Sequence, residues 1–207
     1  MATSLKPHDR LPLVLLALTL ALLVWSGIRP FDYMTWVLEV FPAVAGIIAI
    51  AITHRRFPLT PLALVLIFLH MALLIVGGHY TYARVPLGQW AMDAFNLERN
   101  HYDRLGHFLQ GFVPAMIARE VLLRNRVLAR RGWLAFVIVS ICTAISAVYE
   151  LVEWAVAEAA ESGSVEFLGT QGDVWDTHKD MALCIVGAVV ALLTLSRVHD
   201  RQMAGSR

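Results

Sequence analysis

Residues 119–131 read REVLLRNRVLARR, and this stretch decides the fold of the chain. Five of its thirteen residues are arginine, and an apolar segment lies on each side of it. Short loops rich in Lys and Arg stay on the cytoplasmic side of a bilayer, because these charges resist translocation. We therefore predict that residues 119–131 join two membrane-spanning helices at the cytoplasmic surface.

The rest of the chain fits the same plan. Of its residues, 58% are hydrophobic and 16% are charged, whereas soluble domains carry about a quarter charged residues. Each apolar segment has about 18 to 25 residues, and a helix of that length crosses a hydrocarbon layer of ~30 Å. The sequence predicts an all-α polytopic transmembrane helix bundle in which residues 1–207 form a single domain. Its six predicted spans are 11–28, 33–53, 60–82, 101–123, 133–157 and 178–198.

The distribution of basic residues predicts the direction of the spans. With the N-terminus inside, the cytoplasmic segments hold twelve of the 17 Lys and Arg residues and the outer segments hold five. Six spans with both ends in the cytoplasm preserve this asymmetry loop by loop. No small-x-small cleavage motif closes the first apolar run, so we interpret it as an uncleaved span.

This orientation gathers polar residues at the outer ends of several spans, while the inner halves are expected to carry few ionisable groups. A charge near mid-span costs roughly 2.5–3.5 kcal/mol on insertion scales, so such residues usually face the bundle interior and pair or perform chemistry. We therefore infer a polar site near the outer surface. The residues concerned are His79, Tyr80, Asp103, Arg104, His107, Glu150, Glu153, Asp176, His178, Lys179 and Asp180.

A divalent metal ion is one interpretation of this site. Asp103 and His107 are four residues apart, so both side chains can reach one ion from the same helix face. Together with His178 and Asp180 they are the metal-ligand candidates, and a coordination position left for water would make the centre hydrolytic.

Three further acids on the last two spans are the catalytic candidates. Glu150 and Glu153 are one helical turn apart, and Asp176 opens the last span. Such carboxylates can share metal binding and general-base work. No H-E-x-x-H or paired C-x-x-C motif supports the metal interpretation.

Interhelical ion pairing is the alternative explanation for the same residues. It leaves an excess of acid, because two cations, Arg104 and Lys179, face five carboxylates. Protonation of one or two glutamates would remove that excess without any metal. The five carboxylates are Asp103, Glu150, Glu153, Asp176 and Asp180.

Residues 169–173, GTQGD, form a candidate substrate-binding loop. Glycine lets backbone N–H groups approach an anion, and Thr170 and Gln171 can donate hydrogen bonds. The loop lacks the Gly-Lys-Ser/Thr ending of a P-loop, so nucleotide binding is not expected. His79, Tyr80, Arg104 and Lys179 complete the substrate-binding candidates.

Four strings resemble bacterial inner-membrane proteins of the YjdF type: GGHYTY (77–82), NHYDRLGHF (100–108), YELVEW (149–154) and LGTQGDVWDT (168–177). This resemblance covers nearly the whole chain and implies a multi-pass protein of the bacterial inner, or cytoplasmic, membrane. More remotely, DRLGHF (103–108), Glu150 and Asp176 are similar to three blocks of VanZ-like membrane proteins, although Arg104 stands where those proteins have Lys. That second resemblance implies a role in the cell envelope and names no reaction.

Three functions fit these observations. The first is a hydrolase or transferase, with or without a metal ion, that acts on a lipid or lipid-linked envelope substrate. The second is a non-catalytic binding or scaffolding protein of the envelope. The third is a small transporter, which fits less well because such proteins use internal repeats and mid-membrane charges. The expected partners are membrane lipid and a lipid-linked or anionic small molecule, and a net charge of +1 gives no attraction to nucleic acid.

Overall fold

The computed structural model of the chain describes residues 7–159 and 170–205, so the predicted loop residue Gly169 lies outside the described residues. All regular structure in these residues is helical, which confirms the all-α prediction. The elements are α1 (Pro7–Ser26), α2 (Tyr33–Thr53), α3 (Pro61–Tyr80), η1 (Tyr82–Arg84), α4 (Pro86–Phe95), α5 (Tyr102–Arg124), η2 (Arg131–Trp133), α6 (Leu134–Ala159) and α7 (Asp176–Gly205).

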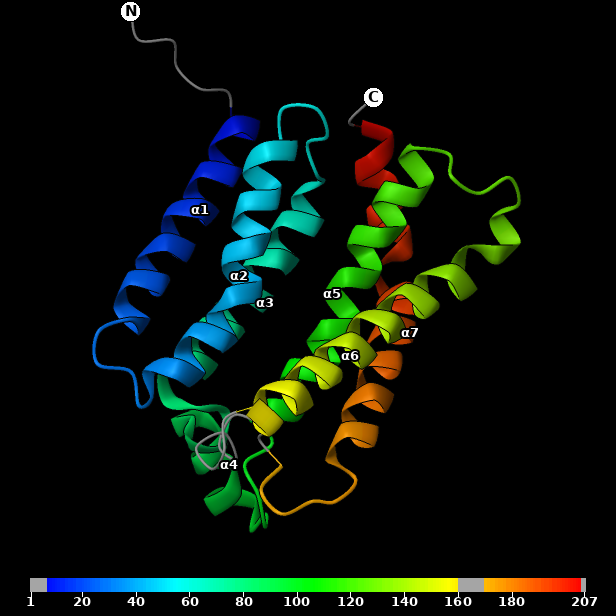
Figure 1. The fold of residues 1–207 in the computed structure, drawn as a ribbon. Coiled ribbons are helices and arrows are strands. Elements are labelled where there is room, and N and C mark those ends of the chain that lie inside the picture. Colours follow the sequence, from blue (N-terminus) through cyan, green and yellow to red (C-terminus); the bar gives the residue numbers. More distant parts are fainter. Residues whose placement is uncertain (1–6, 160–169, 206–207) are drawn as a thin grey trace, which may run out of the picture.

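Among the described residues, the six long helices α1, α2, α3, α5, α6 and α7 run alternately up and down the bundle, so that the start of α1 and the end of α7 lie at the same end (Figure 1). By length and composition, four helical segments can cross a membrane: Tyr33–Thr53, Pro61–Tyr80, Arg131–Ala159 and Asp176–Gly205. The apolar part of α1 is shorter, Arg10–Ser26. α5 is not among these four segments, and it carries buried ionisable residues near both of its ends: Asp103, His107, Arg119 and Glu120.

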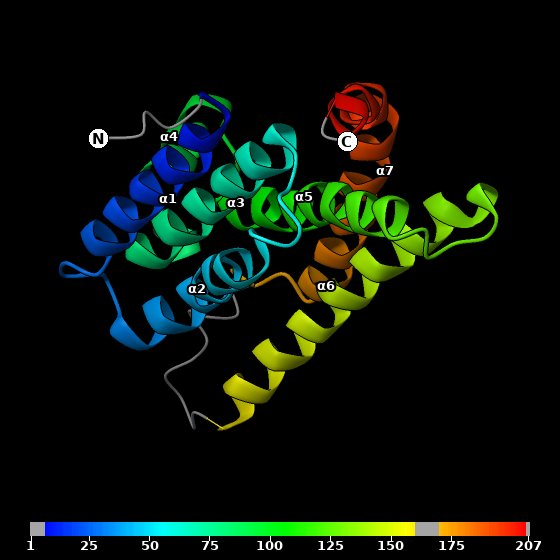
Figure 2. The same ribbon diagram turned by 90° about the horizontal axis from the view of Figure 1, so that it is seen from above.

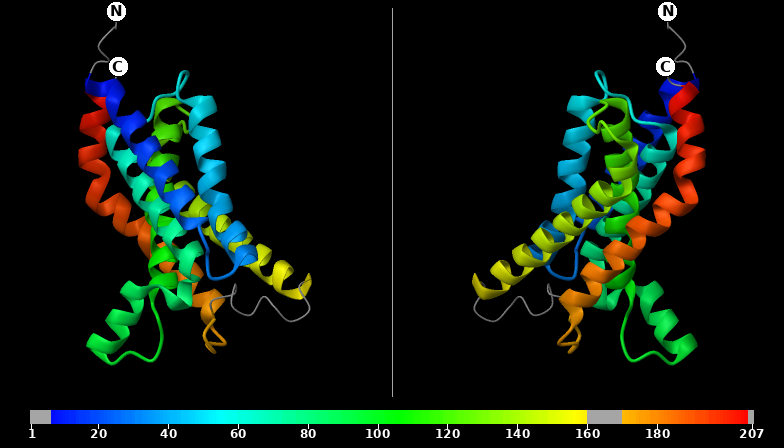
Figure 3. Two further views of the ribbon diagram at one scale, coloured as in Figure 1. Left: turned by 90° about the vertical axis from the view of Figure 1, so that its left-hand side faces the viewer. Right: turned by 90° about the vertical axis from the view of Figure 1, so that its right-hand side faces the viewer.

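The predicted spans agree with the six long helices to within a few residues at most ends. The clearest difference is α7, which begins at Asp176 and continues past the predicted end to Gly205. A further helix, α4, was not predicted; it starts at Pro86, where proline suits the first helical turn. It lies outside the bundle at the end opposite the termini (Figure 3), and its Trp90 and Phe95 side chains are exposed.

α5 occupies the middle of the bundle, with α3 on one side and α6 and α7 on the other (Figure 2). Two glycines let α5 and α7 approach backbone to backbone. A Cβ on Gly111 would lie 1.8 Å from the Cys184 carbonyl oxygen, and one on Gly187 would lie 2.0 Å from the Phe108 carbonyl oxygen. Only glycine fits at both positions, so this contact fixes how the polar faces of α5 and α7 meet.

Candidate functional site

Three buried side chains from α5 and α7 form a group with the composition of a metal site. Asp103 and His107 lie one turn apart on α5, and Asp180 lies opposite them on α7; one ligand atom from each lies within 4.8 Å of the others. The His107 Nε2 atom is 3.5 Å from Asp103 Oδ1. Two ligands bound at ~2.1 Å to one tetrahedral ion are about 3.4 Å apart, so this pair already has a suitable spacing.

The surroundings of His107 favour one orientation of its ring. Its Nδ1 atom lies 3.2 Å from the Gln110 side-chain oxygen and 3.6 Å from Glu150 Oε1. A proton on Nδ1 is held by the Gln110 oxygen, which leaves the Nε2 lone pair directed to the Asp103 side. Metal-bound histidines are oriented in this way by an acceptor on the far nitrogen.

Acids and phenols from neighbouring elements surround this group. Glu150 and Glu153 on α6 are both buried, and Glu39 on α2 is 1% exposed. Among the described residues, two side chains form ion pairs with these acids and with those of the Asp103–His107–Asp180 group. Arg99 pairs with Asp103, and His107 lies close to both Asp103 and Glu150. The group therefore has a surplus of carboxylates, as the sequence predicts.

Several buried oxygens here have no hydrogen-bond partner within the described protein. Buried polar atoms are hydrogen-bonded in the great majority of cases, so such a concentration at one place requires a reason. A bound cation with its waters would satisfy carboxylate oxygens of this kind. The atoms are Glu39 Oε2, Tyr82 OH, Tyr149 OH, Glu150 Oε1 and Asp180 Oδ1.

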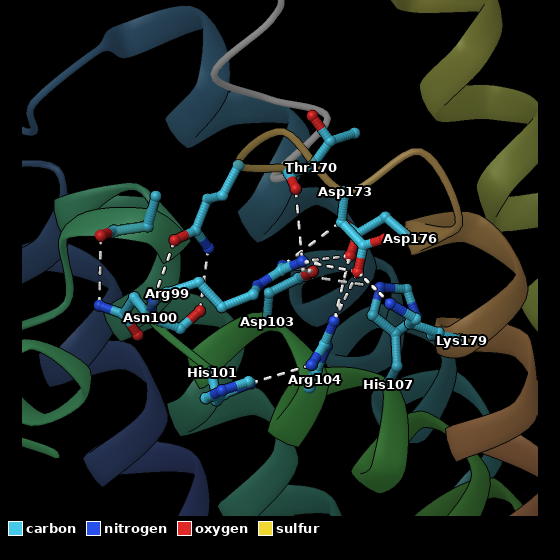
Figure 4. Close-up of polar contacts among 12 residues, drawn as sticks. Arg99, Asn100, His101, Asp103, Arg104, His107, Thr170, Asp173, Asp176 and Lys179 are labelled. Atoms are coloured by element: carbon cyan, nitrogen blue, oxygen red, sulfur yellow. Dashed lines mark hydrogen bonds and ion pairs between the residues drawn. The ribbon is translucent and has the colours of Figure 1, made fainter. Parts of the chain in front are cut away.

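Basic side chains form a second layer, between the acidic group and the turn before α7 (Figure 4). Asp173 Oδ2 lies 2.8 Å from Arg104 Nη2, 2.5 Å from Lys179 Nζ and 3.7 Å from Arg99 Nη1. Asp176 also pairs with Arg99 and lies 3.9 Å from Arg104. The hydrogen bonds from Lys179 and from the Trp175 N–H lower the pKa of Asp173 below its ordinary value of 3.8.

The predicted binding-loop residues Thr170 and Gln171 attach this turn to the start of α5. The Gln171 side chain accepts a hydrogen bond from the Asn100 N–H at 3.0 Å and donates one to the Asn100 carbonyl at 2.9 Å. The Thr170 carbonyl accepts a hydrogen bond from Arg99. α7 begins only at Asp176, so Asp173 lies in the turn, as the neighbouring glycines predict.

Three predicted site residues lie elsewhere. His79 Nδ1 is 2.9 Å from the Ser26 carbonyl oxygen, and the His79 ring lies between those of Trp25 and Tyr80 at the contact of α1 with α3. His178 is exposed with its ring 5.2 Å from that of Trp175, and it does not join the Asp103–His107–Asp180 group.

Sequence reasoning did not assign a role to Arg99, Asn100 or Glu39. Arg99 was counted only as an outer-loop charge, although it is buried and contacts two site acids. Asn100 is fully buried and its side-chain amide donates to the Ala83 and Val85 carbonyls, which fixes the loop that leads into α5. For Arg99 and Asn100, the sequence signal that could have indicated a role was a polar residue immediately before a predicted span.

A second cluster of buried ionisable residues lies at the opposite end of the bundle. Glu120 on α5 and His199 on α7 are fully buried at the end of the bundle near the termini, with Glu120 Oε2 3.0 Å from His199 Nε2. Glu120 also accepts hydrogen bonds from the Thr60 hydroxyl and from Arg124. This second cluster is fully hydrogen-bonded, unlike the first, which indicates a structural role.

Long apolar helices that alternate in direction around buried polar groups define a multi-pass helical membrane protein. Residues 11–201 match the family described as predicted membrane protein (DUF2238), and the chain belongs to this family. It is 48% identical over 204 residues to the inner membrane protein YjdF of Escherichia coli (strain K12), covering 98% of this chain and 96% of that protein. No solved structure matches it. The resemblance to YjdF-type proteins and the inner-membrane location are thereby confirmed.

Proposed function

We propose that the protein is an inner-membrane hydrolase or transferase that acts on a lipid or lipid-linked envelope substrate with a divalent metal ion. In this proposal α1, α2, α3, α5, α6 and α7 are six spans, both ends of the chain are cytoplasmic, and the acidic site lies towards the outer surface. The excess of Lys and Arg on the side of the termini supports this orientation.

One observation carries the metal assignment. Asp103, His107 and Asp180 bring two carboxylates and an imidazole within 4.8 Å of one another, and buried oxygens of Asp180 and Glu150 beside them have no partner within the described protein. A mixed oxygen and nitrogen donor set of this kind suits Zn²⁺ or Mn²⁺. Three protein ligands leave coordination positions for water and substrate.

The surrounding residues suit hydrolysis or group transfer. A bound divalent ion lowers the pKa of its water and polarises the substrate oxygen. Glu150 lies beside His107 with an unpartnered oxygen, so it is the residue we assign as the general base, with Glu153 one turn further along α6. Asp176 is paired with Arg99 and Arg104, and we assign it to positioning these cations.

Incubation with inner-membrane lipid extract tests this function. Protein in nanodiscs should convert a component of the extract, detected by mass spectrometry, only with added Zn²⁺ or Mn²⁺. Glu150→Gln and Asp180→Asn should abolish the conversion, whereas Asp200→Asn, at an exposed position at the opposite end, should not. Conversion that persists in chelator would refute the metal, and an extract left unchanged with either ion would refute the enzyme.

A further inference from the structure

Three cationic side chains converge on a single oxygen atom beside the proposed metal centre. Asp173 Oδ2 is within 4 Å of nitrogen atoms of Arg99, Arg104 and Lys179, which come from the loop before α5, from α5 and from α7. Figure 4 shows the side chains of all three directed at this carboxylate. Convergence from three segments on one atom is the geometry with which proteins hold an anion.

The cations are of the types that recognise phosphate. Arginine presents a planar fork of N–H donors that matches the oxygens of a phosphate, and lysine adds a mobile point charge. Arg104 Nε is buried and has no hydrogen-bond partner within the described residues. A ligand with several acceptor oxygens can satisfy this donor, whereas the Asp173 carboxylate does not.

This cationic group is contiguous with the acidic group. Arg99 Nη2 is 3.8 Å from Asp103 Oδ2, and Asp103 is also one of the three metal-ligand candidates. An anion held by Arg99 and Arg104 would therefore lie next to the ion. Metal and arginine together stabilise the charge that develops on a transferring phosphoryl group.

Asp173 is placed so that it can leave this position. It lies in a turn before α7, where Gln171 and Gly172 have positive φ angles of 46° and 86°. The turn is attached to the start of α5 by the hydrogen bonds between Gln171 and Asn100. A phosphate therefore has to displace only the Asp173 side chain, from the three cations and from the Trp175 N–H, and not the turn itself. Its side chain is partly exposed, at 17%.

We infer that Arg99, Arg104 and Lys179 form a binding subsite for the phosphate of the substrate, which Asp173 occupies until a phosphate displaces it. This inference rests on the proposed function and narrows its substrate to a phosphate-bearing lipid or lipid-linked molecule. The phosphate can belong to a membrane lipid headgroup or to a smaller molecule, since both present the same oxygens.

Binding measured in chelator tests the subsite without depending on the metal. Inorganic phosphate is titrated against the detergent-solubilised protein, and phosphatidic acid is compared with phosphatidylcholine in nanodiscs by native mass spectrometry. Asp173→Asn should bind phosphate about tenfold more tightly than the wild-type protein, because the competing carboxylate charge is gone. Arg104→Gln should weaken binding, and Arg126→Gln, an exposed arginine at the other end, should not change it.

The outcomes separate this inference from the proposed function. Tighter binding of inorganic phosphate identifies a free phosphate group as sufficient, and tighter binding of phosphatidic acid alone identifies a lipid headgroup; either supports the subsite. Unchanged phosphate affinity in Asp173→Asn, in a sample that still unfolds cooperatively and is therefore folded, would overturn it. Lys179→Gln provides a second variant, because its exposed side chain can be replaced without disturbing the core. Phosphate binding by a protein that binds no metal would refute the proposed function alone.

Discussion

Buried acids at the two ends of the bundle have different surroundings. Glu120 is 0% exposed, and both of its oxygens accept hydrogen bonds from Thr60, His199 or Arg124. Asp180 is 3% exposed and has an oxygen with no partner within the described residues. One buried carboxylate therefore has all its hydrogen bonds within the protein, whereas the other has an oxygen available for a ligand. Functional sites commonly lower the stability of a protein in this way.

This contrast predicts opposite effects on stability. Glu120→Ala should lower the free energy of unfolding by about 3–5 kcal/mol, because it leaves buried His199 and Thr60 without their acceptor. Asp180→Asn in metal-free protein should leave the free energy of unfolding unchanged or raise it, since the substitution removes a negative charge from a carboxylate-rich group. Unfolding in mixed detergent micelles measures both, with Asp93→Asn, at an exposed position on α4, as the control. A large loss of stability in Asp180→Asn would indicate a structural role for Asp180.

The turn residue Asp173 gives a prediction of pH dependence. Its folded-state pKa is lowered, chiefly by the hydrogen bond from Lys179, so its contribution to stability is complete above its ordinary value of 3.8. That contribution is lost as the pH falls further through the lowered value. The thermal midpoints of wild-type protein and Asp173→Asn should therefore differ at pH 6 and converge towards pH 2. A difference that persists unchanged at pH 2 would contradict this assignment.

At the level of the helices, the sequence predicted which helices form better than it predicted which helices contact one another. Length and hydropathy were sufficient to mark six long helices, because each must bury a continuous apolar surface. α4 was missed because it has only ten residues, with a polar residue in each turn. The α5–α7 contact was also missed, because Gly111 and Gly187 lie in apolar runs with no local signal of which neighbour they face.

The glycine contact between α5 and α7 should control the site as well as the fold. In Gly111→Ala the new Cβ meets the Cys184 backbone carbonyl, which only a movement of α7 can relieve. We expect destabilisation of about 1–3 kcal/mol or more and weaker metal binding, because Asp180 moves away from Asp103 and His107. Metal titration with unfolding measurements tests this. Gly132→Ala is the control, since nothing described lies within 4 Å of its Cβ; equal behaviour of both variants would contradict the close contact.

Over the whole molecule, the alternating direction of the helices brings polar residues that are far apart in the sequence together in one site. Alternating helix directions bring the start of α5, the end of α6 and the start of α7 together at the end of the bundle away from the arginine-rich loop. The composition of the acidic group follows from that alternation. Which residues belong to the site cannot be predicted from that alternation. His178 is excluded and Arg99 is included because of the rotation of the helices about their axes and the path of the turn before α7.

The orientation itself predicts the outcome of reporter fusions. A reporter that is active only in the cytoplasm should be active after residue 207 and within the loop at residues 125–130, and inactive near residues 93–97 beside α4. A reporter active only outside should give the reverse pattern. A C-terminal fusion active outside would contradict six spans with both ends in the cytoplasm.

Manganese binding followed by electron paramagnetic resonance tests the metal centre most directly. We predict one tightly bound Mn²⁺ per chain, with a nitrogen coupling from His107 that disappears in His107→Ala, and an affinity at least about a hundredfold lower in Asp180→Asn, since even outer-shell changes cost 10- to 100-fold. Wild-type protein that is folded and binds no ion, or binds one whose nitrogen coupling survives in His107→Ala, would contradict a centre formed by Asp103, His107 and Asp180.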